Sequence, residues 1–518
     1  RKATDRYSSQ SGYGFVETAQ SIPAGSPRSV DLDGIVQNES GVSITETEAT
    51  TSYSSSSDYN YGGIIFGFDA GDPGAYKITV NTTEGTTSDN AQIAVSGMEA
   101  RRITGTGAWD AAGLVARNTV AVWSGNSWSY NYVSATGYIE VEVEPNARPN
   151  SSGTTVGIES IVVEPIANNP ADGKPTIFIL GDSTQKTYTF EEDGMSSWGQ
   201  TIYRLFDLDE VNVVNYSMGG RCMRSSYTEG RLNDVLMTAK EGDYILIHSA
   251  HNDERPTEIN QRFGGGSNDE LYPQWLDMYC DAATARGLNT VLVSGMPRTN
   301  DGVPITNSAK PNGFDPDSPT FMKNKAAENA SDTIEYVDLF HLAKDYLEKI
   351  GSDETKNIYL SLEAGESPGK TNSGSYANGH PDDKIDGTHY KEAAGKAYSK
   401  LIGEDIVRQA SETDSVVMDT LASYLTDDVQ AGNWDNVFPE QRAKDVTEVA
   451  LNGNPEGSSS YYRNQIEKAL QLGIMDTDEN DMFNPTDNMK TNDFIAALCA
   501  IWRLDAAEFS EFYGSGDL

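Results

Sequence analysis

The sequence predicts a multidomain protein built around a three-layer α/β unit, with a parallel five-stranded sheet, an N-terminal β-sandwich before it and a helical region after it. Five short apolar runs alternate with helical patterns between residues 174 and 410, strand-like runs fill residues 1–166, and strand patterns stop after residue 411. A chain of 518 residues also exceeds one ordinary hydrophobic core, so several domains are expected.

The first region, residues 1–166, is rich in Ser, Thr, Gly, Tyr and Val. Runs such as 75–81 and 137–143 alternate apolar and polar residues and are separated by turn residues. A period of two is typical of strands with one buried face, so we expect an antiparallel β-sandwich. The polar stretch 167–175, which contains two prolines, predicts a linker.

The second region, residues 174–410, predicts a parallel sheet with helices on both faces, because short apolar runs alternate with segments of helical spacing. A last helix is expected from Tyr390 to about Arg408, where small and apolar residues share one face. The expected strands are 176–180, 211–215, 244–247, 290–293 and 334–337.

The third region, residues 411–518, is acidic and is expected to be helical. It contains one unit of two helices joined by a polar loop, at 461–504. A calcium loop beginning at Asp476 is the alternative, but Asp481 occupies the position at which such a loop requires Gly.

Composition excludes several classes of partner. The formal net charge is −40, with 78 acidic and 38 basic residues, and such a field repels nucleic acids and anionic membrane surfaces. No run of eighteen apolar residues predicts insertion into a membrane. The three cysteines, Cys222, Cys280 and Cys499, cannot form a disulfide framework and contain no C-x-x-C pair for zinc.

Three candidate site segments follow the first three expected strands, at the edge where open parallel sheets bind ligands. Ser183 stands on a tight turn in 181–184, Gly220 lies in the glycine pair after the second strand, and Asn252 follows the third. A serine on such a turn exposes its hydroxyl group, and Asn252 can offer an amide to an oxyanion. The structural alternatives are a helix cap at Ser183 and ordinary turns at the other two.

A fourth candidate precedes the last helix. Asp386 stands three residues before His389, close enough on one turn to fix the imidazole tautomer. The alternative is that Thr388 caps the helix and His389 lies on the surface. A metal site is a further alternative, but a mixed cluster of this kind in a loop is more often solvated charge. Its members would be His380, Asp382, Asp383, Asp386 and His389.

Together, these groups supply what acyl transfer needs: a nucleophile, a base with its orienting acid, and oxyanion donors. Their order resembles the SGNH (GDSL-like) hydrolases, and Ser183, Gly220, Asn252 and His389 match the four residues that name that family. The resemblance implies a flavodoxin-like catalytic domain and a serine esterase with Asp386 and His389 as the activating pair. Its oxyanion hole would consist of the Ser183 N–H, the Gly220 N–H and the Asn252 side chain.

The neighbouring motifs resemble those of rhamnogalacturonan acetylesterases. They lie at 181–184, 198–200, 219–221, 229–232, 251–253 and 386–389. Residues 7–15 and the β-rich segment behind them are similar to the N-terminal domain of two-domain bacterial members, which implies a galactose-binding-like fold. Two positions depart from the pattern, Ala250 for a usual Gly and Cys222 for a usual Ser, and neither removes a catalytic group.

The resemblance implies removal of O-acetyl groups from pectic rhamnogalacturonan, without a cofactor or a metal ion. Arg221, Arg224 and His251 are the expected substrate-binding residues, because Arg can clamp a galacturonate carboxylate with two hydrogen bonds. The alternative for the arginines is pairing with acids such as Glu229. The alternative functions are an esterase for another acetylated glycan such as xylan, or for lipid, and a non-catalytic, wall-anchored carbohydrate-binding protein.

The unit at 461–504 resembles an S-layer homology unit, which implies a cell-wall polymer as a partner. An extracellular or wall-associated protein is therefore expected. The chain itself begins with polar residues and contains no block typical of a signal peptide, which leaves the route of secretion open.

Overall fold

The computed structural model describes most of residues 5–439 and parts of the segment beyond them. The described residues are 5–23, 29–30, 32–45, 63–98, 119–145, 153–188, 195–253, 268–305, 318–328, 332–360, 370–371, 374–375, 386–439, 443, 466, 469–470, 474–484 and 487–502.

A parallel five-stranded sheet forms the centre of the second region, as the sequence predicted. Its order is β12 (Asn212–Asn215), β11 (Thr176–Gly181), β13 (Tyr244–His248), β14 (Asn289–Val293) and β17 (Ile334–Val337), and all pairs are parallel. Strand β13 is buried along its whole length, which explains why the residues before His248 form a continuous apolar run rather than an alternating one.

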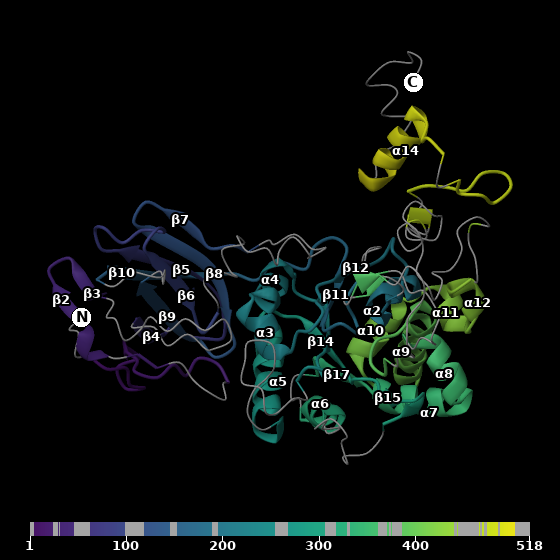
Figure 1. The fold of residues 1–518 in the computed structure, drawn as a ribbon, viewed down its shortest axis with the longest axis horizontal. Coiled ribbons are helices and arrows are strands. Elements are labelled where there is room, and N and C mark those ends of the chain that lie inside the picture. The colour runs from purple at the N-terminus through teal and green to yellow at the C-terminus, as the bar shows by residue number, and fades with distance from the viewer. Residues whose placement is uncertain are drawn as a thin grey trace.

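Helices cover both faces of this sheet (Figure 1). Residues of β11 alternate between two hydrophobic clusters, with Phe178 and Leu180 in one and Ile177 and Ile179 in the other. The first cluster includes α3 (Met223–Thr228), α4 (Arg231–Thr238), α5 (Asn268–Ala285) and α6 (Ser318–Ala327). The second includes α2 (Trp198–Thr201), α7 (Leu339–Ile350), α8 (Ser352–Ile358) and α9 (Glu392–Glu412).

Two antiparallel sheets precede the α/β unit. The four-stranded sheet has the order β1 (Tyr13–Phe15), β4 (Ile64–Asp69), β9 (Tyr138–Pro145) and β6 (Ala91–Val95). The six-stranded sheet has the order β2 (Val36–Asn38), β3 (Gly41–Thr45), β10 (Thr155–Ile166), β5 (Gly74–Thr82), β8 (Ser127–Ser134) and β7 (Val122–Ser124). Of the two alternating runs noted in the sequence, 75–81 lies in β5, and 137–143 lies in β9 apart from its first residue.

Strand β8 packs against α3 and α4, so the antiparallel sheets contact the α/β unit directly (Figure 1). The hydroxyl oxygens of Tyr132 and Tyr227 lie 2.9 Å apart, and the Val133 amide donates to Asn233 Oδ1 at 2.8 Å. One hydrophobic cluster runs from the antiparallel strands into α3, α4 and α5. The β-rich region is therefore packed against the α/β unit.

The core of the α/β unit extends past the expected boundary at residue 410. Three further helices follow α9, namely α10 (Val416–Ser423), α11 (Asp427–Ala431) and α12 (Trp434–Val437). Met418 and Leu421 are completely buried in the same cluster as the sheet. The Thr426 amide also donates to Leu205 O at 2.9 Å.

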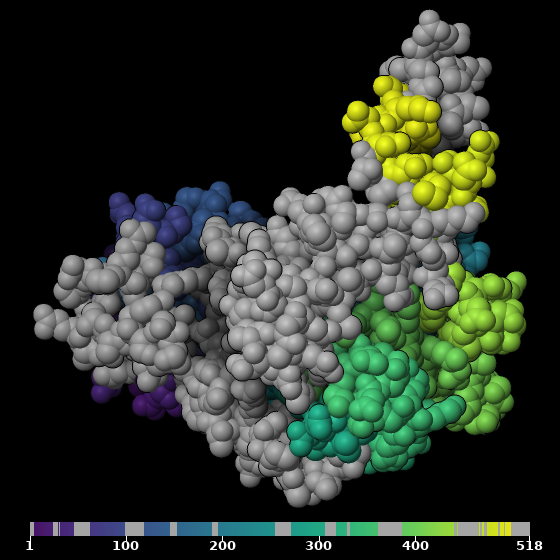
Figure 2. Space-filling model, turned by 45° about the vertical axis from the view of Figure 1, so that its right-hand side comes forward, coloured from purple at the N-terminus to yellow at the C-terminus, as the bar shows by residue number. Residues whose placement is uncertain are grey.

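The described residues beyond 466 lie apart from this body (Figure 2). They include α14 (Thr491–Trp502), which stands above the α/β unit in Figure 1. Among the described residues, no helix has both the length and the apolar character that crossing a bilayer requires.

Candidate active site

Ser183 lies on the turn that follows β11, and the side chains of Asp182, Tyr188 and Tyr390 fix the backbone of that turn. Asp182 Oδ1 accepts hydrogen bonds from the Thr184 amide and the Thr184 hydroxyl group, both at 2.8 Å. The Tyr188 hydroxyl group donates to Ser183 O at 2.6 Å, and the Tyr390 hydroxyl group donates to Thr184 O. Ser183 is partly exposed while Asp182 is fully buried, so the turn presents the serine side chain and hides the aspartate.

His389 connects Ser183 to Asp386. Its Nε2 lies 3.0 Å from Ser183 Oγ, and its Nδ1 lies 3.0 Å from Asp386 Oδ2. The other oxygen of Asp386 accepts the backbone amides of Thr388 and His389 at 2.9 Å, which fixes the carboxylate. In this arrangement a neutral His389 can accept the Ser183 proton on Nε2 while its Nδ1–H donates to the carboxylate.

The Asp386 carboxyl group is held in its charged form. Burial by itself raises its pKa, but the hydrogen bond and the charge of His389, with two backbone amides, outweigh burial and lower the pKa to about 2. Asp386 is therefore an anion near neutral pH, as a group that stabilises an imidazolium must be.

The glycine loop after β12 lies beside the serine. A Cβ atom on Gly219 would stand 3.8 Å from Ser183 Cβ, and Gly220 has a φ of +74°, which a side chain would disfavour. Asn252 is tied to the same loop, because its Nδ2 donates to Arg221 O at 3.1 Å. The glycine loop therefore lies next to Ser183, and Asn252 is hydrogen-bonded to the same loop.

Arg221 and Arg224 are buried, each about 6% exposed. Arg221 Nη2 lies 3.0 Å from Glu229 Oε1, and Arg221 Nη1 donates to Gly219 O at 2.8 Å. The ion pair with Glu229 is the alternative weighed for these arginines from the sequence. Arg221 therefore holds the glycine loop in place through its bond to Gly219 O. Its buried position does not by itself support contact with a glycan.

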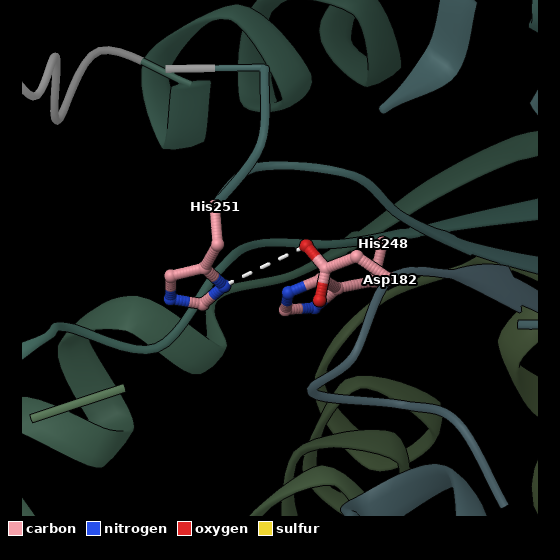
Figure 3. A group of neighbouring side chains, drawn as sticks. All are labelled: Asp182, His248 and His251. Atoms are coloured by element: carbon pink, nitrogen blue, oxygen red, sulfur yellow. Dashed lines mark ion pairs between the residues drawn. The ribbon is translucent and has the colours of Figure 1, made fainter. Parts of the chain in front are cut away.

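His251 also lies behind the nucleophile turn, where it forms a buried group with Asp182 and His248 (Figure 3). Asp182 Oδ2 is 3.8 Å from His251 Nδ1, and the His251 and His248 rings stack with centroids 5.8 Å apart. His251 Nε2 lies 3.0 Å from Met296 O, a carbonyl oxygen that can only accept. Burial lowers the pKa of His248 to about 3, so that ring is neutral.

One ring nitrogen from each histidine and one carboxylate oxygen of Asp182 lie within 4.8 Å of one another, a spacing that could hold a metal ion. The Thr184 hydroxyl group already reaches all three, at 2.8 Å from Asp182 Oδ1, 3.4 Å from His251 Nδ1 and 3.5 Å from His248 Nε2. Among the described residues, the buried atoms Asp182 Oδ2 and His248 Nδ1 have no hydrogen-bond partner, so the Thr184 hydroxyl group satisfies only part of the cluster. The other metal ligands weighed from the sequence, His380, Asp382 and Asp383, lie outside the described residues.

The sequence did not predict the side chains that hydrogen-bond to the turn of Ser183, namely those of Thr184, Tyr188 and Tyr390. It also overlooked the segment after the fourth strand, Met296–Thr299, which contacts the loops of both Asn252 and His389. The signal for this segment was available, because it follows a parallel strand at the same edge as the other site loops.

A family model described as the S-layer homology domain matches residues 456–490. The kind of unit predicted near the C-terminus is thus confirmed, and the match begins and ends earlier than the predicted 461–504.

Curated relatives match part of the chain. The chain is 28% identical over 230 residues to rhamnogalacturonan acetylesterase RhgT of Bacillus subtilis, a match covering 44% of this chain and 88% of that protein. It is 26% identical over 218 residues to rhamnogalacturonan acetylesterase of Emericella nidulans, covering 39% and 82%. These relatives confirm the predicted resemblance and the predicted class, an ester hydrolase.

Among solved structures, the chain is similar to protein YxiM of Bacillus subtilis. The identity is 18%, the TM-score is 0.36, and the match covers 79% of this chain and 94% of that one.

Proposed function

We propose that this chain removes acetyl groups from a pectic glycan, rhamnogalacturonan, through an acyl-enzyme formed on Ser183. The observation that carries the chemistry is the unbroken line of contacts from Ser183 Oγ through His389 to Asp386, with both links at 3.0 Å. The names of the curated relatives support the substrate class.

In the first half of the reaction, Ser183 Oγ attacks the acetyl carbonyl carbon while His389 Nε2 takes the serine proton. The carbonyl oxygen becomes an oxyanion, and His389 becomes an imidazolium whose charge Asp386 offsets. His389 then gives the proton to the departing sugar oxygen, which leaves an acetyl group on Ser183.

The oxyanion is bound by the Ser183 N–H, the Gly220 N–H and the Asn252 side-chain amide. In the second half, water attacks the acetyl-enzyme with His389 as the base, and acetate leaves as Ser183 recovers its proton. No step requires a cofactor or a metal ion.

The remaining regions receive supporting roles in this proposal. Residues 1–166 form a galactose-binding-like β-sandwich, 174–410 carry the chemistry, and 411–518 form the helical C-terminal region. The S-layer homology unit binds a cell-wall polymer and keeps the esterase at the cell surface. Arg221, Arg224 and His251 stay candidates for contact with the glycan, although their burial favours support of the site loops.

Acetate release from acetylated pectin, acetylated xylan and p-nitrophenyl acetate tests the proposal. We expect the highest kcat/KM on pectin and a loss of several orders of magnitude in Ser183→Ala. Ser411→Ala, a change on the exposed end of α9, is the matched control and should keep full activity. Wild-type turnover in a folded Ser183→Ala protein would contradict the mechanism, and a preference for xylan would contradict the substrate.

A further inference from the structure

The segment after β14, Met296–Thr299, touches both halves of the candidate active site. On one side, Met296 O lies 3.0 Å from His251 Nε2, one residue before Asn252. On the other side, the Thr299 amide donates to Gly387 O at 2.8 Å, two residues before His389. A Cβ atom on Gly387 would stand 1.9 Å from Thr299 O, so these two stretches of backbone lie in direct contact.

Arg298 spans the same gap with its side chain. Its Nη2 donates to His251 O at 2.7 Å, and its Nη1 donates to the Thr388 hydroxyl group. One guanidinium group therefore joins the residue before Asn252 to the residue before His389. The two partners are separated from each other by more than 130 positions in the sequence.

We propose that Arg298 is a positioning residue, which holds the loop of His389 against the loop of Asn252 so that the base and the oxyanion donor keep one relative geometry. The proposal rests on the proposed function, since it assigns these two loops to one reaction. Arg298 would act through His389 and Asn252 and would not itself touch the reacting atoms.

The contacts form a closed ring, which is why one side chain can matter. From Ser183 the ring passes to the adjacent Asp182, to His251, to Arg298 and to the loop of His389, which returns to Ser183 Oγ at 3.0 Å. If the Arg298 link is removed, the ring opens, and the His389 loop keeps two backbone hydrogen bonds, from the Thr299 amide to Gly387 O at 2.8 Å and from the Leu360 amide to His389 O at 3.1 Å. A misplacement of about 1 Å at a reacting group can lower a rate about 10²-fold.

Lysine cannot reproduce this link. The guanidinium group presents donors from separate nitrogen atoms in a rigid plane, whereas an ammonium group is a single point of charge. Arg298→Lys should therefore recover only part of the function, although it keeps the charge.

The experiment compares Arg298→Ala and Arg298→Lys with Arg286→Ala. Arg286 is the matched control, because it is also buried and donates to a backbone carbonyl oxygen, Leu236 O at 3.0 Å, on the side of the sheet that carries α4 and α5. With p-nitrophenyl acetate, and with rates corrected for the folded fraction, we expect kcat to fall about 10- to 100-fold in Arg298→Ala. KM should change little, and Arg286→Ala should affect only the melting temperature.

Two further readouts separate positioning from simple loss of stability. Guanidinium ion, added below the concentration that lowers the melting temperature, should restore part of kcat to Arg298→Ala and none to Ser183→Ala. The low-field NMR proton of the Asp386–His389 hydrogen bond should weaken or shift in Arg298→Ala and stay in place in Arg286→Ala.

An unchanged kcat in folded Arg298→Ala, or an unchanged low-field proton, would overturn the inference while leaving the esterase mechanism standing. An inactive wild-type protein, or an active Ser183→Ala protein, would instead refute the proposed function. The NMR comparison needs no substrate, so it would still decide whether Arg298 positions His389.

Discussion

Asn252 contacts the glycine loop through the same amide group that is proposed to bind the oxyanion. Its Nδ2 carries two protons, and only one is needed for the bond to Arg221 O at 3.1 Å. The second proton can therefore serve the substrate while the first holds the side chain in place. Asn252 can therefore donate one hydrogen bond to the oxyanion and one to the backbone of the glycine loop.

Asn252→Ala should lower kcat by about 10²–10³, the usual effect of one lost oxyanion donor. Asn233→Ala is the matched control, since Asn233 also donates its amide to a backbone carbonyl oxygen, Asn131 O at 2.8 Å, but at the contact with β8. Initial rates on p-nitrophenyl acetate, normalised to the folded fraction, provide the measurement. Equal effects in the two variants would assign Asn252 a structural role only.

Asp253 is a buried acid whose protonation should make the free energy of unfolding depend on pH. Burial raises its pKa to about 8, with a further contribution from the nearby Asp182. The unfolded chain releases this proton near pH 4, whereas the folded protein keeps it to about pH 8. Between these values the folded state binds more protons, so the Asp253 contribution to stability falls as the pH rises.

Asp253→Asn imitates the protonated acid and should remove that dependence. We expect the stability of the variant, relative to wild type, to increase from pH 5 to pH 8 in denaturant titrations. Asp386 does not interfere, because its lowered pKa confines its own contribution to changes below about pH 4. Parallel stability curves for the two proteins over this range would show that Asp253 titrates normally.

At the scale of elements, the sequence predicted the sheet well, because burial on both faces leaves a continuous apolar run that periodicity detects. His389, 206 positions from Ser183, is expected from its place before the last helix and its spacing from Asp386, whereas the rule that ligand sites follow parallel strands places Ser183, Gly220 and Asn252 at one edge. The sequence could not predict that Asp182 points inward to His251, or that Arg298 reaches Thr388. Those contacts depend on side-chain directions set by long-range packing, which no local pattern records.

Helix α3 illustrates how a departure from a family pattern can keep its structural role. Cys222 caps the helix, since its Sγ accepts the Ser225 amide at 3.5 Å while Ser225 Oγ accepts the Cys222 amide at 3.0 Å. The sulfur atom thus takes the part that a serine hydroxyl group usually plays.

Cys222→Ala should lose this cap and cost about 1 kcal/mol, which lowers the melting temperature by about 2–4 °C in a domain of this size. Cys222→Ser should keep the cap and show a melting temperature at or above that of wild type. Differential scanning calorimetry makes the comparison. If serine destabilised the protein as much as alanine, the cap would contribute nothing.

At the scale of the whole molecule, the hydrophobic core of the α/β unit does not end where the strand pattern ends. Helices α10 and α11 bury Met418, Leu421 and Val429 in the cluster that contains the sheet. The sequence predicts that the α/β region ends at residue 410, but these side chains belong to its hydrophobic core.

A protein truncated after Ala410 should therefore be unstable, whereas truncation after Pro439 should leave a folded, active esterase. Each large apolar side chain contributes about 1.5–3 kcal/mol by burial, and domain stabilities are only about 5–15 kcal/mol. Soluble yield, circular dichroism and turnover of the two truncated proteins provide the test. An active protein ending at Ala410 would show that α10 to α12 are accessory.

The net charge of −40 should shape the response to ionic strength. Repulsion between this field and a galacturonate polymer is screened by salt, so KM for acetylated pectin should fall as salt rises. KM for the neutral p-nitrophenyl acetate should stay constant, which makes it the internal control. A KM for pectin that rises with salt would indicate that local cations attract the polymer more strongly than the whole protein repels it.

The contact between β8 and helices α3 and α4 determines how far this protein can be treated as a set of interchangeable modules. Tyr132 meets Tyr227 there, and the helix that carries Tyr227 begins three residues after Gly220. The N-terminal sheets and the catalytic unit should consequently melt in a single calorimetric transition. A graft of the α/β unit onto a foreign carrier would have to rebuild this contact, or the loop of Gly220, the proposed oxyanion donor, would lose its support.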